Sequence, residues 1–188
     1  MTRELGLSPR LDGGGLARLR ELLRAGGGLM GELLGEPSAD GEEGAVSPAS
    51  IAAAGPRAAG QREEYELLVE AIYEGYLLHY GSPRVVDVPE ADLGLLAGDR
   101  LYAIGLARLV ELGDTLAVAE LADTITLGAL AHGAGRPELA EAAWEAGASA
   151  VGWGSTPAHR RAKQMLVGGD PEALDAMRTC VRTVPAPR

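Results

Sequence analysis

The chain has 188 residues, of which 46% are hydrophobic and 4% are aromatic, and it contains no phenylalanine. This length and composition are typical of one globular domain whose core consists of Leu, Ala, Val and Ile. The formal net charge of −10 argues against nucleic acid as a partner, because binding a phosphate backbone requires clustered Lys and Arg.

The sequence contains no signal for export or for insertion into a membrane. The first residues, MTRELGLSPRLDGGG, lack the continuous apolar region of a signal peptide. No run of about 18 uncharged apolar residues predicts a membrane span. The only cysteine, Cys180, cannot form an internal disulfide, which favours a reducing compartment. We therefore expect a cytoplasmic protein.

Residues 1–60 have the composition of a flexible, low-complexity arm with one short amphipathic helix. From about residue 26 to residue 60, Gly, Ala, Ser, Pro and Glu follow one another without periodicity, which predicts a linker. The helix is predicted for LARLRELLRAG, whose apolar face either packs on the rest of the chain or docks to a partner or a membrane surface. The leucines of this face are Leu16, Leu19, Leu22 and Leu23.

Residues 61–183 are predicted to form an all-α domain, a compact antiparallel bundle of about six helices, followed by a frayed tail at 184–188. The first helix begins at Gln61 and ends at Gly81. Asp114 is a candidate N-cap, because its side chain can accept from free amides of a first turn. Two further helices are expected from Pro89 to about Gly113 and from Asp114 to Gly133 or Gly135. The last three are expected from Pro137 with a candidate break near Gly147, from Ser155 or Thr156 to Met165, and from Asp170 onward. RVVDV is expected as one short extended piece.

The residues that carry chemistry form no recognisable catalytic or metal-binding motif. None of the three histidines has a Cys, a His or a carboxylate three or four residues away in the sequence. Nucleophile-elbow, Walker A, dinucleotide-binding and calcium-loop patterns are also missing from the sequence. We therefore expect no metal and no cofactor, and nothing in the sequence indicates an enzyme.

Asp99 is the most informative polar residue. On a helix it shares a face with Tyr102 and two leucines, where a charge is costly unless it is paired. Asp99 is therefore expected either to form a structural hydrogen bond between helices or to contact a bound ligand. The expected partners are Tyr76, Tyr80, Arg84 or Arg100. The candidate ligand-binding residues are Asp99, Tyr102, Tyr76, Tyr80 and Arg84.

One stretch resembles a known protein family. DLGLLAGDRLYAIGLARLVELGDTLAVAELADTI is similar to the helix pair that follows the first aspartate-rich region of trans-isoprenyl diphosphate synthases. The sequence has no adjacent Asp-Asp pair, although the family needs such clusters to hold magnesium. The resemblance therefore implies an inactive relative or a non-catalytic accessory subunit. The matching residues are Leu96, Ala97, Gly98, Asp99, Leu101, Tyr102, Leu112, Gly113 and Asp114.

Three functional hypotheses follow. The leading one is a non-catalytic helical protein that associates with another protein or with itself, as an accessory or pseudoenzyme relative of polyprenyl diphosphate synthases. The alternative is a helical scaffold or interaction domain unrelated to isoprenoids, in which the leucine-rich helix captures a partner. The third is a binder of a small ligand, an isoprenoid or another lipid in a pocket lined by Tyr and Asp.

Overall fold

The computed structural model describes residues 14–35 and 46–182, and the structural statements below concern these ranges. Residues 1–13 and 36–45 of the predicted arm and the predicted tail at 184–188 lie outside these ranges. The described part is all-α, as predicted, and its single extended pairing is an isolated bridge between Leu34 and Val86 of the RVVDV segment. The elements are α1 (Gly14–Gly26), α2 (Gly28–Glu32), α3 (Pro48–Ala54), the 3₁₀ turn η1 (Pro56–Ala58), α4 (Arg62–Tyr80), α5 (Ala91–Glu111), α6 (Thr115–Gly133), α7 (Pro137–Trp153), α8 (Pro157–Val167) and α9 (Ala173–Arg178).

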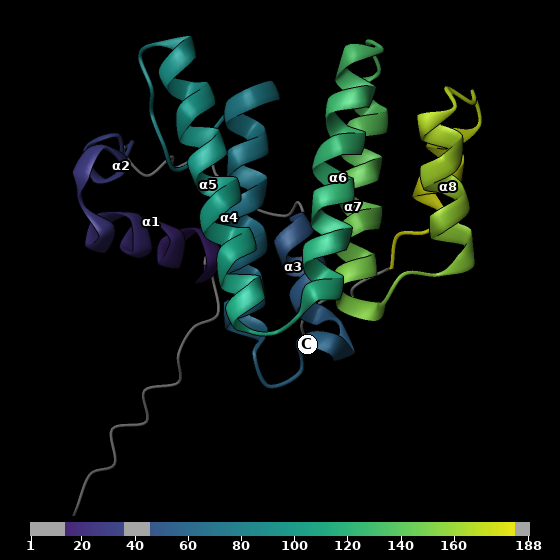
Figure 1. The fold of residues 1–188 in the computed structure, drawn as a ribbon, viewed down its shortest axis with the longest axis horizontal. Helices are drawn as coiled ribbons and strands as arrows, with labels where there is room; N and C mark the ends of the chain where they lie inside the picture. The colour runs from purple at the N-terminus through teal and green to yellow at the C-terminus, as the bar shows by residue number, and fades with distance from the viewer. Residues whose placement is uncertain (1–13, 36–45, 183–188) are drawn as a thin grey trace, which may run out of the picture.

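The long helices pack as two pairs that lie side by side (Figure 1). α4 packs along α5, and α6 packs along α7. Successive helices of these pairs run alternately up and down in the view. α3 lies between the pairs and contacts both α4 and α7, whereas α8 and α9 pack against the second pair. Within the described ranges, no helix combines the length and the apolar character that crossing a bilayer requires.

Helix α3 corrects the linker that the sequence predicts up to residue 60. Pro48–Ala54 is helical, and three of its residues lie in the main core: Ala49, Ile51 and Ala52. The segment has a start signal of its own, since the Ser47 hydroxyl accepts from the Ser50 amide at 3.1 Å. Alanine-rich helices give little hydrophobic periodicity, which explains why the composition resembles a linker. The helical domain therefore begins before residue 61.

Glycines allow the helices to approach until their backbones are almost in contact. Between α5 and α4, a Cβ atom added at Gly98 would lie 2.9 Å from the carbonyl oxygen of Gly75. After α3, a Cβ atom at Gly55 would overlap the backbone of Gly152 on α7. A larger residue at either crossing would force the helices apart. Part of the glycine content of the sequence is thus used at helix crossings.

Asp114 joins three parts of the fold. It caps α6, as predicted, because its Oδ1 accepts from the Ala117 amide at 3.0 Å. Arg57 of η1 donates to its two carboxylate oxygens at 2.7 and 2.8 Å, and the hydroxyl of Tyr65 on α4 donates to Oδ2 at 2.5 Å. Burial would raise the pKa of Asp114, but these hydrogen bonds outweigh burial and lower it. The turn between α5 and α6 is therefore fixed to both η1 and α4.

The close contact between α3 and α7 can be tested with Gly55→Ala. We expect the free energy of unfolding to fall by about 3 kcal/mol, because the new methyl group meets backbone atoms that have no rotamer to change. Gly133→Ala is the matched control, since a Cβ atom there meets nothing within 4 Å and alanine favours the helix. Urea unfolding followed by circular dichroism measures both variants, and equal stabilities would contradict the contact.

Candidate functional site

Arg84, one of the predicted ligand-binding residues, is tied to buried acids. Glu74 is completely buried, and its Oε1 accepts from the amides of Arg84 at 2.6 Å, Val85 at 2.6 Å and Val86 at 3.3 Å. The Arg84 guanidinium pairs with the carboxylates of both Glu70 and Glu74. Burial raises the pKa of Glu70, and the charge of Arg84 offsets part of this rise. The cluster holds the connection between α4 and α5 in place.

Two of the predicted ligand-binding tyrosines, Tyr76 and Tyr80, belong to an aromatic cluster between the helix pairs. Tyr76 is 4% exposed, and its hydroxyl lies 2.8 Å from Nε2 of His132 on α6. The ring of Tyr80 stacks on the same imidazole at a centroid distance of 4.6 Å, and Trp144 of α7 lies 5.0 Å from the Tyr76 ring. Tyr102 of α5 contacts a different histidine, and its hydroxyl is buried without a hydrogen-bond partner among the described residues. Tyr76 and Trp144 thus belong to the core.

Asp99 lies at the surface. Its side chain is 69% exposed, and its Oδ1 lies 3.4 Å from Nε2 of His79 on α4. The reason is that this end of α5 is not covered, since Leu95 on the same face is itself 46% exposed. Neither cavity described below is lined by any of the five predicted ligand-binding residues. The ion-pair partner of Asp99 is His79, and not one of the predicted residues Tyr76, Tyr80, Arg84 and Arg100.

The predicted amphipathic helix, α1, packs on the domain. Leu19 and Leu23 are 0% and 3% exposed and belong to a second core that includes residues of α4 and α5. Leu16 and Leu22 are partly buried against the same core. The leucine face is therefore covered by the chain itself. One edge of it, at Leu22 and Leu23, borders a cavity.

This cavity is an apolar groove of about 550 Å³ between α1, α2 and α5. Leu29 and Leu96 in its wall are 54% and 66% exposed. Its ionisable lining residues are Arg100 and Arg108, and no acidic residue of the described ranges lines it. The groove could not be predicted from the sequence, because its walls come from three helices. Hydrophobic periodicity predicts each helix but not how the helices are placed relative to one another. The apolar lining residues are Leu22, Leu23, Leu29, Met30, Leu93, Leu96, Ala97 and Ile104.

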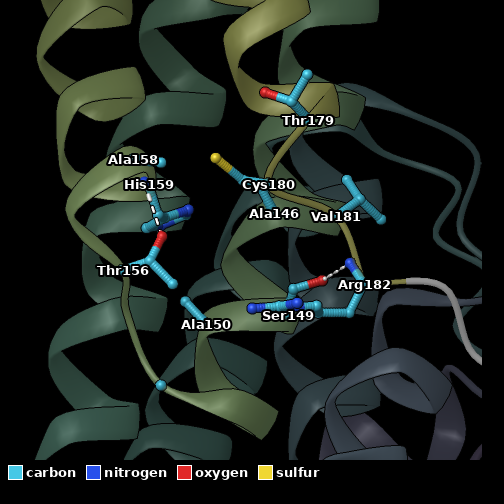
Figure 2. Close-up of a pocket in the computed structure, with 11 residues that line it drawn as sticks. Ala146, Ser149, Ala150, Thr156, Ala158, His159, Thr179, Cys180, Val181 and Arg182 are labelled. Atoms are coloured by element: carbon cyan, nitrogen blue, oxygen red, sulfur yellow. Dashed lines mark hydrogen bonds between the residues drawn. The ribbon is translucent and has the colours of Figure 1, made fainter.

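A second cavity of about 310 Å³ lies between α7, the start of α8 and the segment after α9 (Figure 2). His159, Cys180 and Arg182 are among its lining residues. The thiol of Cys180 donates to the carbonyl oxygen of Ala176 at 3.2 Å, and burial raises its pKa. A neutral thiol in a hydrogen bond is not prepared to act as a nucleophile. The sequence gives no sign of this site, because its residues come from separate segments.

A charge cluster of α6 and α8 lies beside His159. Glu120 Oε2 is 3.4 Å from Nε2 of His159 and accepts from Lys163 at 2.9 Å, and Lys163 also donates to Asp123 at 2.7 Å. Burial would raise the pKa of Glu120, but its contacts with His159 and Lys163 outweigh burial and lower the pKa to about 2. Among the residues that the structure describes, no group of three or more His, Cys, Asp or Glu side chains is placed to hold a metal ion.

No family model, no curated protein and no solved structure matches the chain. The resemblance to trans-isoprenyl diphosphate synthases therefore stays a prediction from the sequence.

The structural role of the buried acid cluster is tested with Glu74→Gln. We expect the free energy of unfolding to fall by about 2 kcal/mol, because an amide group cannot pair with Arg84 and accept from three backbone amides as a carboxylate does. Urea unfolding measures the change. Glu111→Gln, at the exposed end of α5, is the control and should be neutral. A neutral Glu74→Gln would show that the connection does not depend on the carboxylate.

Acid is expected to weaken the fold through Glu120. Its pKa is about 2 against an ordinary value of 4.5, so its stabilising contribution is complete above pH 4.5 and is lost as the pH falls toward 2. Glu120→Gln should therefore melt at a lower temperature than the wild type near neutral pH, with a difference that shrinks on acidification. Melting temperatures measured against pH check this, with the exposed Glu141→Gln as control. A difference that stays constant would contradict the assignment.

Proposed function

We propose that this chain acts by protein association, and that the groove between α1, α2 and α5 binds an amphipathic helix with acidic side chains from a partner. The observation that carries the proposal is an apolar groove whose ionisable lining residues, Arg100 and Arg108, are both basic. The proposed docking surface lies beside α1, the leucine-rich helix, and a partner would bind in the groove rather than on the buried leucine face.

The apolar side chains of the groove supply the attraction. Leu29 and Leu96 leave more than half of their surface in water. Covering such surface contributes roughly 25 cal/mol per Å² of apolar area removed from water. Grooves of this kind typically take the apolar face of a helix, whose side chains at helical spacing enter the space between the walls.

The charges at the groove select the occupant. The chain has a net charge of −10, which repels acidic partners at most of its surface. The charged residues that line the groove, however, are Arg100 and Arg108. Arg108 also forms a salt bridge with Glu64 at 3.2 Å. Arg100 is exposed at the groove. Acidic side chains on either side of an apolar helix face would therefore be attracted to this site.

The wall formed by α2 can adjust to an occupant. Gly27 and Gly28 join α1 to α2 with φ values of 61° and 60°, and Gly27 also lines the groove. Met30, on α2, has an unbranched and adaptable side chain. The Met30 side chain can therefore adapt to an occupant, while Leu33–Gly35 after α2 stay paired with the α4–α5 connection. The resemblance to trans-isoprenyl diphosphate synthases suggests a candidate for the cytoplasmic partner. This candidate is a catalytic subunit of such an enzyme.

Two synthetic peptides of about 18 residues test the proposal, each with leucines at helical spacing and either glutamates or lysines at the other positions. Fluorescence anisotropy of the labelled peptides should show saturable binding of the acidic peptide and weaker binding of the basic one. We expect Leu96→Ser and Arg100→Glu each to weaken binding at least about fivefold, which corresponds to about 1 kcal/mol.

Leu116→Ser is the matched control, because Leu116 on α6 is 65% exposed against 66% for Leu96 and lies outside the groove. It should leave binding unchanged. Equal binding of both peptides, or equal weakening by Leu116→Ser, would contradict the proposal. Binding of a fatty acid or an isoprenoid alcohol, with no binding of either peptide, would assign the groove to lipids and would overturn protein docking.

A further inference from the structure

The cavity between α7, α8 and the segment after α9 contains an imidazole without a hydrogen-bond partner (Figure 2). His159 is 3% exposed, and neither of its ring nitrogens makes a hydrogen bond to the described residues. Nε2 lies 3.4 Å from Glu120, and Nδ1 is buried without a partner in the wall of the cavity that His159 lines. Since buried polar atoms are nearly always paired, this imidazole points to an occupant.

The N-terminus of α8 opens on the same cavity. Thr156 caps the helix, and its hydroxyl accepts from the His159 amide at 3.1 Å. Pro157 has no amide hydrogen, and the amide of Ala158 in the first turn has no acceptor inside the helix. Both Thr156 and Ala158 line the cavity. The free amides and the helix dipole favour a negative charge at this point.

Arg182, in the segment after α9, contributes a positively charged side chain to the lining of the same cavity. Its backbone amide donates to the Ser149 hydroxyl at 2.9 Å, which holds the segment after α9 on α7. In Figure 2, the side chain of Arg182 extends across Ser149 toward Ala150. No acidic residue of the described ranges lines the cavity. A guanidinium group, a helix N-terminus and an imidazole therefore face one space without a carboxylate among them.

We propose that this cavity binds a phosphate group, held by Arg182, His159 and the first turn of α8. Each of these groups binds oxyanions, and a guanidinium matches the planar pair of oxygens on a phosphate. The volume of about 310 Å³ also admits a small organic substituent on the phosphate. The site is separate from the apolar groove and does not depend on the function proposed for it.

Phosphate binding at this site is linked to a proton on His159. The carboxylate of Glu120 favours a hydrogen on Nε2, so Nδ1 of the neutral ring would present a lone pair to the anion. An ionised phosphate oxygen at Nδ1 would need a second proton on the ring, and Glu120 and the phosphate would stabilise that charge from opposite sides. The charged or titratable groups around the ring are Glu120, Asp123, Lys163, Cys180 and Arg182.

Inorganic phosphate is the probe, titrated into the ¹⁵N-labelled full chain at constant ionic strength. The amides of Ala158 and His159 should shift along one saturating curve, with a dissociation constant on the order of 1 mM. Calorimetry in two buffers with different ionisation enthalpies should detect proton uptake on binding. Glycerol 3-phosphate is titrated in parallel: tighter binding identifies a phosphate monoester as the ligand class, and equal affinity identifies free phosphate.

Arg182→Gln is expected to weaken phosphate binding at least about fivefold, and His159→Gln should abolish the proton uptake. Arg178→Gln removes an exposed cation four residues earlier, outside the cavity, and should change neither. The absence of saturable shifts at Ala158 and His159, or undiminished affinity in Arg182→Gln, would overturn the proposal. Because Arg182 is exposed, its variant stays decisive even if His159→Gln fails to fold.

Discussion

The carboxylate of Glu74 helps to hold α1 and α2 on the domain. By accepting from the amides of Arg84, Val85 and Val86, it fixes the α4–α5 connection at a position where no water can replace it. The chain around Leu33–Gly35 then pairs with this fixed segment through two backbone hydrogen bonds, at 3.0 and 2.8 Å. Arg20 of α1 donates to the Arg84 carbonyl oxygen at 2.7 Å. The walls of the apolar groove are therefore held indirectly by one buried acid.

The polar groups of this fold are satisfied in different ways at the groove, at the buried acids and at His159. In the groove, the apolar lining is left partly in water, and the charges stand at positions where solvent can reach them. Around Glu74 and Asp114, every negative charge is met by several donors. His159 differs, because its Nδ1 is buried without a hydrogen-bond partner among the described residues and the residue lines a cavity. The Tyr102 hydroxyl is buried without a partner too, but Tyr102 lines neither cavity.

Helix type and most boundaries could be predicted from the sequence, because they depend on local signals. The side chain of Asp114 caps α6, and Gly81 ends α4, as expected. α3 was missed because alanine buries well without producing a strong periodic pattern. Asp99 was expected to be shielded because its helix face contains leucines, but whether a face is covered depends on the neighbouring helix, which periodicity does not specify. The cavity residues Ser149, His159 and Arg182 become neighbours only through the packing of α7, α8 and the segment after α9.

The glycine crossings have a consequence for recognising distant relatives of this chain. Leucine and valine in the core can exchange with one another at little cost, so the apolar pattern can drift until pairwise similarity is lost. At Gly55, Gly98 and Gly105 no such exchange is open, because the facing helix occupies the space of any side chain. The spacing of these glycines is therefore expected to outlast the rest of the sequence, and it provides a better signature of descent than the hydrophobic residues around it.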